Sequence, residues 1–237
     1  MITGSTGANS YTEGEILLFD KPFGWTSFDL VRKVRNILYR SLKIKNLKVG
    51  HAGTLDPLAT GLMILCTGKA TRQIESLQAG EKEYIATIKL GATTPSFDLE
   101  TKEDNQYPAD HISQLLLEET LKQFTGNILQ VPPVFSAVKI NGKRAYEHAR
   151  KGSEPELKPK KIVIKSIELV SFQLPEVVLR ITCGKGTYIR ALARDIGIAM
   201  QSGAYLTGLR RTRSGIYKVE EAGSVESFLK KIDSLIQ

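Results

Sequence analysis

The sequence predicts a mixed α+β protein whose sheet is mostly antiparallel and flanked by helices. Strand-like and helix-like segments are interleaved, but without the strict strand–helix–strand rhythm of a parallel α/β fold. Hydrophobic residues make up 41% of the 237 residues, which is enough to build a core. We find no internal repeat and no linker rich in Pro, Gly and Ser. We therefore expect a flexible tail over residues 1–13 and a single domain over residues 14–237.

The first predicted strand is the short apolar run from Glu15 to Phe19. A turn follows it and ends at Thr26 or Ser27, either of which suits the N-cap of a helix. Apolar residues then recur at helical spacing, which predicts a helix with basic residues on or near its opposite face. These apolar residues are Phe28, Val31, Val34 and Leu38.

The remaining elements are predicted from apolar residues that recur with the period of a helix or alternate as in a strand. Strands are expected at 62–66, 84–91, 161–170 and 177–183, with a strand or turn at 209–215. Helices are expected at 113–124, 188–200 and 225–237. Residues 131–152, VPPVFSAVKINGKRAYEHARKG, predict a loop that leads into a short basic helix.

The charge balance favours a polyanionic partner. The net charge is +8 and the isoelectric point is about 9.4. Nucleic acid is the first candidate and an anionic membrane surface the second. Basic residues fall into two acid-poor blocks, 32–55 and 180–218, which a fold could bring onto one face. There is no apolar run of about 18 residues and no secretion signal, so we expect a cytoplasmic protein.

Several cofactor and metal chemistries lack their sequence signature. Cys66 and Cys183 are far apart and form no CxxC motif, so they are expected in the core. The three histidines show no ligand spacing. The segment CGKGT at 183–187 lacks the first glycine of a phosphate-binding loop, and no GxGxxG follows a strand. We expect neither a cofactor nor a metal.

One carboxylate stands out in the segment GHAGTLDPLATG, residues 50–61. Asp56 follows a stretch that contains seven lysines and arginines and no acidic residue from Val31 onward. An aspartate in a loop is most often a turn-former or a helix cap. Here the surrounding glycines allow a ligand to approach, and Pro57 stiffens the chain directly after the carboxylate. Both readings stay open on the residues alone.

Several motifs, in this order along the chain, resemble the TruB family of tRNA pseudouridine synthases, of the bacterial type without a C-terminal PUA domain. They are DKPFGWTSFDLVRKVR, GHAGTLDPLATGLMILCTGKATR, KEYIATIKLGATTPSFD, VPPVFSAVKINGKRAYEHARKG, CGKGTYIRALARDIG and LRRTRSG. The resemblance runs from about Gly14 to near the C-terminus. It implies the pseudouridine synthase fold and the isomerisation of a uridine in the T loop of tRNA, at position 55, without cofactor or metal.

The resemblance also implies roles for single residues. Asp56 matches the catalytic aspartate, which could act as a nucleophile or a base. His51 matches a residue that contacts the RNA near the target nucleotide, and Tyr84 matches the tyrosine that stacks on the extracted base. Tyr188 matches a substrate-contacting tyrosine, and Arg190 an arginine that pairs with the aspartate and keeps it ionised. Leu209 matches an apolar residue of the base pocket.

The predicted partner is the T-arm stem-loop of tRNA, with no membrane, no obligate protein partner and a monomeric enzyme. Many family members continue into a PUA domain, for which the residues after LRRTRSG leave no room, so the grip on RNA is expected from the catalytic domain. Three alternatives remain: a guide-dependent synthase, a non-catalytic RNA-binding or tRNA-folding module, and a hydrolytic nucleosidase. The last of these would release free uracil.

Overall fold

The computed structural model describes residues 8–136, 139–140, 143–144 and 157–235. The chain forms two compact units: unit 1 is Met1–Lys82 with Arg210–Gln237, and unit 2 is Glu83–Leu209. The sequence gives no sign of these boundaries, because both lie within strands and neither coincides with a linker. The predicted α+β fold with a mostly antiparallel sheet is confirmed.

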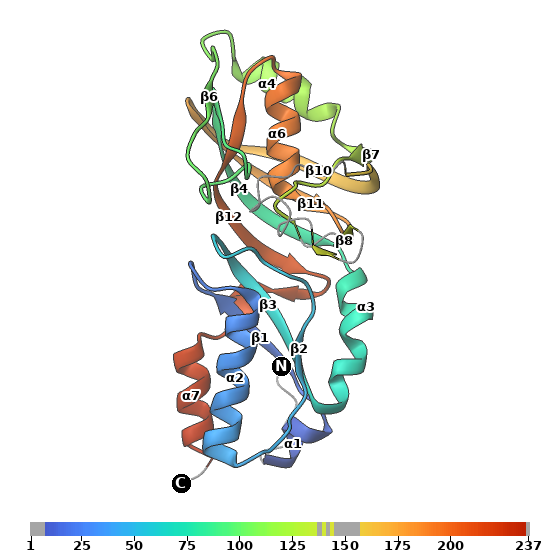
Figure 1. Cartoon of the computed structure of the whole chain (residues 1–237), viewed down its shortest axis with the longest axis vertical. Coiled ribbons are helices and arrows are strands. Elements are labelled where there is room, and N and C mark those ends of the chain that lie inside the picture. Colours follow the sequence, from blue (N-terminus) through green and yellow to red (C-terminus); the bar gives the residue numbers. More distant parts are fainter. Residues whose placement is uncertain (1–7, 137–138, 141–142, 145–156, 236–237) are drawn as a thin grey trace. The chain divides into compact units, whose positions relative to one another are not determined.

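Unit 1 combines a small antiparallel sheet with helices (Figure 1). Strands β1 and β3 pair along their length, β2 pairs with β3, and the C-terminal part of β12 continues the sheet beyond β3 and pairs with β13. Its elements are α1 (Ala8–Glu13), β1 (Ile16–Lys21), α2 (Ser27–Leu42), β2 (Val49–His51), β3 (Ala59–Thr67), η1 (Gly68–Gln73), α3 (Ile74–Ala79), the end of β12 (Ala204–Ser214), β13 (Tyr217–Lys218), η2 (Val219–Glu221) and α7 (Val225–Asp233).

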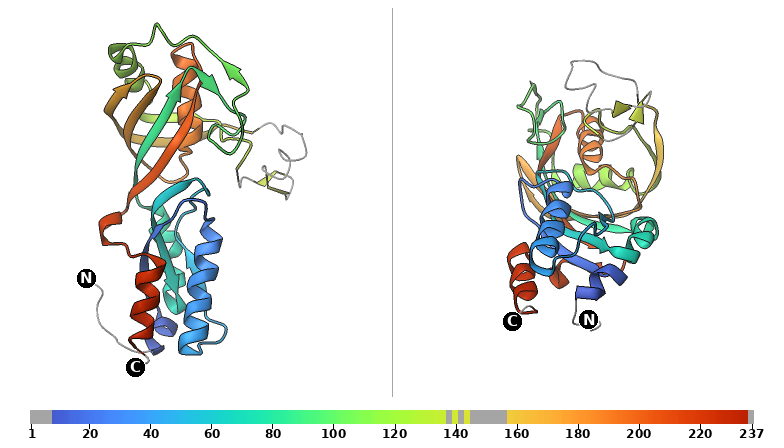
Figure 2. Two further views of the ribbon diagram at one scale, coloured as in Figure 1. Left: turned by 90° about the vertical axis from the view of Figure 1, so that its left-hand side faces the viewer. Right: turned by 60° about the horizontal axis from the view of Figure 1, so that its bottom comes forward.

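Helix α2 begins where the sequence predicts. Thr26 is its N-cap, and a capping box with Asp29 satisfies backbone donors of the first turn. The helix packs beside α7, as Figures 1 and 2 show. The prediction that Phe28 belongs to its buried face is wrong, because Phe28 is 61% exposed. The residues of α2 that are buried instead are Ser27, Leu30, Val31, Val34, Ile37 and Leu38.

The predicted flexible tail over residues 1–13 differs from the structure at its C-terminal part. Residues Ala8–Glu13 form helix α1, and Tyr11 within it is only 3% exposed. The Tyr11 ring meets the Phe228 ring of α7 edge-on, with 6.3 Å between centroids. Glu13 of the same helix pairs with Lys69 at 2.6 Å, so an aromatic contact and an ion pair both hold a segment whose composition predicts a tail. Residues 1–7 lie outside the described part of the chain.

The described residues of unit 2 form an antiparallel sheet with helices packed against it (Figure 2). Within the unit the strand order is β12, β4, β11, β10 and β7. Its elements are β4 (Lys82–Leu90), β5 (Ala92–Thr93), β6 (Asn105–Gln106), α4 (Gln114–Lys122), β7 (Gly126–Gln130), β8 (Lys139–Ile140), β9 (Lys143–Arg144), β10 (Lys160–Gln173), β11 (Glu176–Cys183), α6 (Ile189–Ala199) and most of β12.

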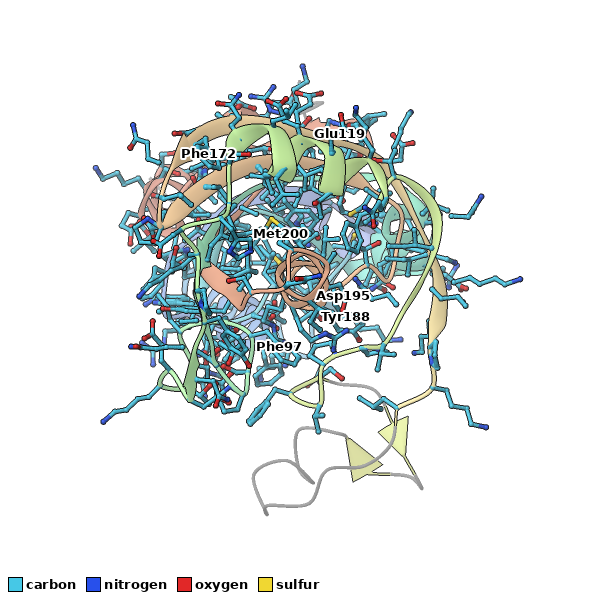
Figure 3. The ribbon with its side chains drawn as sticks, turned by 90° about the horizontal axis from the view of Figure 1, so that it is seen from above. Phe97, Glu119, Phe172, Tyr188, Asp195 and Met200 are labelled. Carbon is cyan, nitrogen blue, oxygen red and sulfur yellow. The ribbon has the colours of Figure 1, made fainter. Side chains whose placement is uncertain are left out.

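The predicted elements of unit 2 are confirmed within a few residues. Strand β4 alternates between buried and half-buried side chains, as its period of two indicates. Figure 3 looks along α6, with α4 above it, and α4 contacts both α6 and β10. The sequence did not predict β7, nor η1 and α3 of unit 1. The predicted short basic helix falls mainly on residues 145–156, which lie outside the described residues.

Candidate active site

Asp56 lies in the irregular loop between β2 and β3, and the backbone on both sides of it is fixed. On one side, the Ser27 hydroxyl accepts from the Leu55 N–H and donates to the Leu55 carbonyl, both at 2.9 Å. On the other side, the Pro57 carbonyl accepts from the Gly24 N–H at 2.9 Å and from the Lys21 ammonium at 3.3 Å. The Asp56 side chain itself is only partly buried. The loop therefore presents one carboxylate from a rigid frame.

Arg211 supports the same loop from β12. Its guanidinium is buried, and the residue is 1% exposed. Nη2 donates to the Gly53 carbonyl at 3.1 Å, Nη1 to the Thr54 carbonyl at 3.4 Å, and Nε to the Leu62 carbonyl at 2.7 Å. One side chain thus ties the loop before Asp56 to the strand after it. A buried positive charge is costly unless it is well hydrogen-bonded, and here neutral carbonyls supply those bonds.

Gly61 allows β12 to come this close to β3. Its φ is +100°, in the region that favours glycine. A Cβ at this position would lie 2.3 Å from the Arg211 carbonyl oxygen and 2.8 Å from the Arg211 nitrogen. Any side chain would push the two backbones apart, and Arg211 would then lose its reach to the loop. Gly61, the last glycine of the segment 50–61, therefore has a packing role.

Lys21, at the end of β1, places a second positive charge against the loop. The side chain is fully buried, and its ammonium donates to the carbonyls of Pro22, Trp25 and Pro57. Burial is the main cause that lowers the pKa of Lys21 to about 8. The Asp56 carboxylate opposes this shift, and the Arg211 charge acts in the same direction as burial. Asp56 thus has an anionic side chain near two buried cations, Lys21 and Arg211.

His51, at the end of β2, is half-buried and belongs to the same unit as Asp56. Burial lowers the pKa of His51, the Arg211 charge adds to this effect, and the Gly53 backbone opposes it. The ring is therefore neutral at pH 7. Its buried Nδ1 has no hydrogen-bond partner of normal geometry among the residues that the structure describes. A neutral imidazole in this setting suits hydrogen bonding to a ligand better than charge pairing.

Arg190, in the first turn of α6, is held inside unit 2. It is 6% exposed, and its Nε lies 3.5 Å from Oδ2 of Asp98, which is equally buried. Its two terminal nitrogens donate to the carbonyls of Ser96 at 3.1 Å and Phe135 at 2.8 Å. Three anchors therefore fix the direction of this guanidinium. The predicted pairing of Arg190 with Asp56 would join the two units and stays a prediction.

The other three predicted residues also lie in unit 2. Tyr188 is the N-cap of α6, and buried Gln130 clamps its backbone: the Tyr188 N–H donates to Oε1 at 2.9 Å, and Nε2 donates to the Tyr188 carbonyl at 3.1 Å. Figure 3 shows Tyr188 beside α6. Tyr84 is 9% exposed on β4, and Leu209 is half-buried on β12, the neighbouring strand.

The structure thus places the predicted residues in two sets, His51 and Asp56 in unit 1 and the other four in unit 2. Sequence reasoning missed the supporting residues, which are Ser27, Asp98, Gln130 and Arg211. Their partners lie 28 to 158 residues away along the chain, so no local spacing reveals them. Ser27, Asp98 and Arg211 do lie in the motifs DKPFGWTSFDLVRKVR, KEYIATIKLGATTPSFD and LRRTRSG, but no role in supporting the site was predicted for them.

The described residues contain no group of three His, Cys, Asp or Glu side chains arranged to hold a metal ion. Cys66 on β3 and Cys183 on β11 are both buried among apolar residues, as expected for core positions. Burial raises the pKa of Cys66 to about 11, so its thiol is inert at neutral pH. Within the part of the chain that is described, no helix has the length and apolar character needed to cross a membrane.

The two units together have the pseudouridine synthase fold. A chain in the crystal structure of a Cbf5–Nop10–Gar1 complex matches 93% of this chain with a TM-score of 0.71 and 29% sequence identity. A second, in the structure of an H/ACA RNP bound to a substrate RNA containing 2′-deoxyuridine, matches 93% with a TM-score of 0.67 and 26% identity. The chain spans about half of each solved protein, 54% in both cases.

The sequence comparisons define the family. Residues 39–189 match the N-terminal domain of the TruB family of pseudouridylate synthases. The tRNA pseudouridine synthase B of Phocaeicola vulgatus is 60% identical over 224 residues, which cover 94% of this chain and 95% of that protein. The enzyme of the same name from Flavobacterium johnsoniae is 51% identical over 92% of this chain and 96% of that protein. The chain belongs to the TruB family and is an enzyme of the pseudouridine synthase class.

Proposed function

We propose that this enzyme isomerises a uridine in the T loop of tRNA, at position 55, to pseudouridine, with Asp56 as the catalytic carboxylate. The observation that carries the proposal is the rigid loop around Asp56. Ser27, Lys21, Gly24 and Arg211 fix the backbone on both sides of a carboxylate that remains partly accessible. The names of the relatives, tRNA pseudouridine synthase B, support tRNA as the substrate.

The chemistry needs one ionised carboxylate at the sugar of the target nucleotide. Breaking the bond between N1 of uracil and C1′ leaves an electron-poor sugar, and Asp56 would either attack it or remove a ribose proton. The base then turns and forms a bond from C5 to C1′, C5 loses its proton, and N1, which no longer bonds the sugar, gains one. The sum is an isomerisation, so no co-reactant is required. The buried Lys21 ammonium interacts electrostatically with the Asp56 carboxylate.

The remaining predicted residues would receive the flipped nucleotide. Tyr84 and Tyr188 would line the pocket with Leu209, and His51, neutral at pH 7, would contact the RNA beside it. Arg190 would orient Asp56, because Asp98 and two carbonyls already fix its guanidinium. We further propose that the enzyme acts as a cytoplasmic monomer on the T-arm stem-loop, gripping the phosphates with its basic residues.

The deciding experiment is incubation with unmodified tRNA, followed by mapping of pseudouridine by mass spectrometry. A T-arm stem-loop of roughly seventeen nucleotides should react nearly as well as intact tRNA, because loops and splayed bases are what proteins read in RNA. An unstructured strand of the same sequence should not react. Release of free uracil would indicate a nucleosidase instead. Binding of tRNA without any product would indicate a non-catalytic module, and either result would overturn the proposal.

A further inference from the structure

The solvent face of helix α2 carries two large aromatic side chains where polar residues are expected. Phe28 is 61% exposed and Tyr39 is 51% exposed. Arg32 and Asn36 lie between them, and the four residues follow one another at steps of three or four, so they form one stripe along the helix. Phe23, on the turn just before α2, is 62% exposed. Single exposed apolar residues are common, but here three exposed aromatic residues lie on or next to one stripe of the helix surface.

Two hollows lie along this stripe, both within unit 1. The first, of about 580 Å³, is lined by Gly24, Trp25, Asp29, Arg32, Lys33 and Asn36. The second, of about 810 Å³, has Asn36 and Tyr39 among its walls, together with Arg35, Lys45 and Lys48. Asn36 is common to both, so the hollows adjoin. From Phe28 to Tyr39 the stripe is about 16 Å long, at about 1.5 Å per helical residue.

The charge of this surface is positive. Residues 28–50 contain seven lysines and arginines and a single acid, Asp29. Asp29 forms an exposed ion pair with Arg32 at 3.0 Å, and Glu226 of α7 interacts with Lys33, so these two cations are partly balanced. Arg40, Lys43, Lys45 and Lys48 are exposed and lie toward the far end of the stripe. Exposed aromatics interleaved with cations are the arrangement that binds unpaired nucleotides.

We propose that the outer face of α2 binds single-stranded RNA, with nucleobases stacked on Phe28 and Tyr39 and phosphates held by the basic side chains around them. The inference rests on the proposed function. The nucleotides bound at this surface would be unpaired nucleotides of the RNA substrate other than the target uridine. A duplex would not use these aromatics, because its bases are already stacked within the helix. Phe23 and Trp25 would extend the stacking surface toward the loop that holds Asp56.

The test measures binding of a ten-nucleotide oligouridylate to the full chain by fluorescence anisotropy. All variants are made in an Asp56→Asn background, so that no chemistry intervenes. Phe28→Ala and Tyr39→Ala should each weaken binding about tenfold, and the double variant should weaken it more. Phe28→Trp should retain affinity, because it preserves an aromatic face. Ile198→Ala is the matched control, since Ile198 is equally exposed, at 65%, but lies on α6 of unit 2.

Trp25 provides a second readout. It is the single tryptophan of the chain and lines the first hollow, so a nucleobase entering there should quench its fluorescence. The quenching should weaken in Phe28→Ala. Unchanged affinity in the double variant, or an equal loss for a blunt RNA duplex, would overturn the proposal. So would a greater loss of binding to anionic vesicles than to RNA, which would assign the face to a membrane.

The two proposals can fail separately. Pseudouridine formation by the Asp56-containing enzyme tests the proposed function, and oligouridylate affinity of the Asp56→Asn variants tests the single-strand site. If the enzyme made no pseudouridine on any tRNA, the proposed function would be wrong. Loss of oligouridylate binding in the double variant would still establish the single-strand site in that case.

Discussion

The Arg211 guanidinium and the Gly53 carbonyl oxygen lie 3.1 Å apart, three residues before Asp56 in the chain. The same guanidinium also holds the carbonyls of Thr54 and Leu62, one before Asp56 and one after it. Arg211 therefore acts as a brace for the loop and does not need to touch the substrate. Its charge also lowers the pKa of both Lys21 and His51.

Replacement of Arg211 should lower both the stability of the protein and the rate of the reaction. Arg211→Met removes three hydrogen bonds from a charged donor and leaves buried carbonyls without partners, so we expect the free energy of unfolding to fall by about 3 kcal/mol. We expect kcat to fall at least tenfold, because the position of Asp56 loosens. Denaturant unfolding and pseudouridine formation measure the two effects. Arg213→Met, two residues further along β12, should change neither much, and a normal kcat for Arg211→Met would refute the brace.

Asp56→Asn should abolish turnover while tRNA affinity stays within a few-fold of the wild type. The amide is nearly isosteric with the carboxylate, and the backbone anchors of the loop do not involve the side chain. Single-turnover assays with labelled tRNA and filter binding would separate the two quantities. Turnover at the normal rate would remove Asp56 from the mechanism.

The Arg190–Asp98 pair should be a strong interaction, since both side chains are at most 8% exposed. Asp98→Asn removes a carboxylate that pairs with the buried Arg190 guanidinium, so we expect a loss of about 3 kcal/mol in the free energy of unfolding and a large drop in kcat. Glu119→Gln is the control, because the exposed pair of Glu119 with Lys122 should be worth at most about 1 kcal/mol. Equal stability of the two variants would contradict this account.

Lys21 should make stability depend on pH above neutrality. Its pKa is about 8 in the folded chain, against the usual 10.5, so the unfolded chain binds more protons between these values. The cost of burying the charge is therefore present below about pH 8 and is relieved as the pH rises toward 10.5. The difference in unfolding free energy between wild type and Lys21→Met should shift by about 3 kcal/mol across this window. A constant difference would show that Lys21 has an ordinary pKa.

Affinity for tRNA should fall steeply with salt. If several of the lysines and arginines in residues 32–48 and 210–218 contact phosphates, Kd should rise about tenfold or more between 50 and 200 mM salt, because counterions are released on binding. Replacement of Arg40 or Lys43 by Gln should reduce that slope without altering kcat. A flat salt profile would contradict a phosphate-binding basic surface.

Much of the fold follows from local sequence signals. The cap at Thr26, the alternation along β4 and the helical period of α6 were all visible, because each depends on neighbours a few residues apart. Phe28 was misplaced because its spacing fits the buried stripe loosely, whereas Leu30 and Ile37 complete the true one. Only packing against α7 and the sheet decides between these faces.

The residues of the candidate site were likewise predictable from the sequence only in part. Asp56 was noticeable from its charge contrast and its glycine-rich loop, and the family resemblance supplied the other predicted residues. Ser27, Gln130 and Arg211 could not be predicted, because their roles are backbone contacts made across long stretches of chain. A serine after an N-cap or an arginine in LRRTRSG has many possible partners, and only the tertiary structure selects one.

The route of the chain through its two units has a consequence for synthesis on the ribosome. The residues of unit 2 lie between the two parts of unit 1 in the sequence. Arg211 is therefore made 158 residues after Gly53, whose carbonyl accepts its hydrogen bond. Translation proceeds from the N-terminus, so the loop with Asp56 emerges early and lacks Arg211 and α7 until residues 204–233 have been made. Nascent or truncated chains that end before β12 should therefore lack a formed active-site loop, and RNA modification would begin only after β12 has been made.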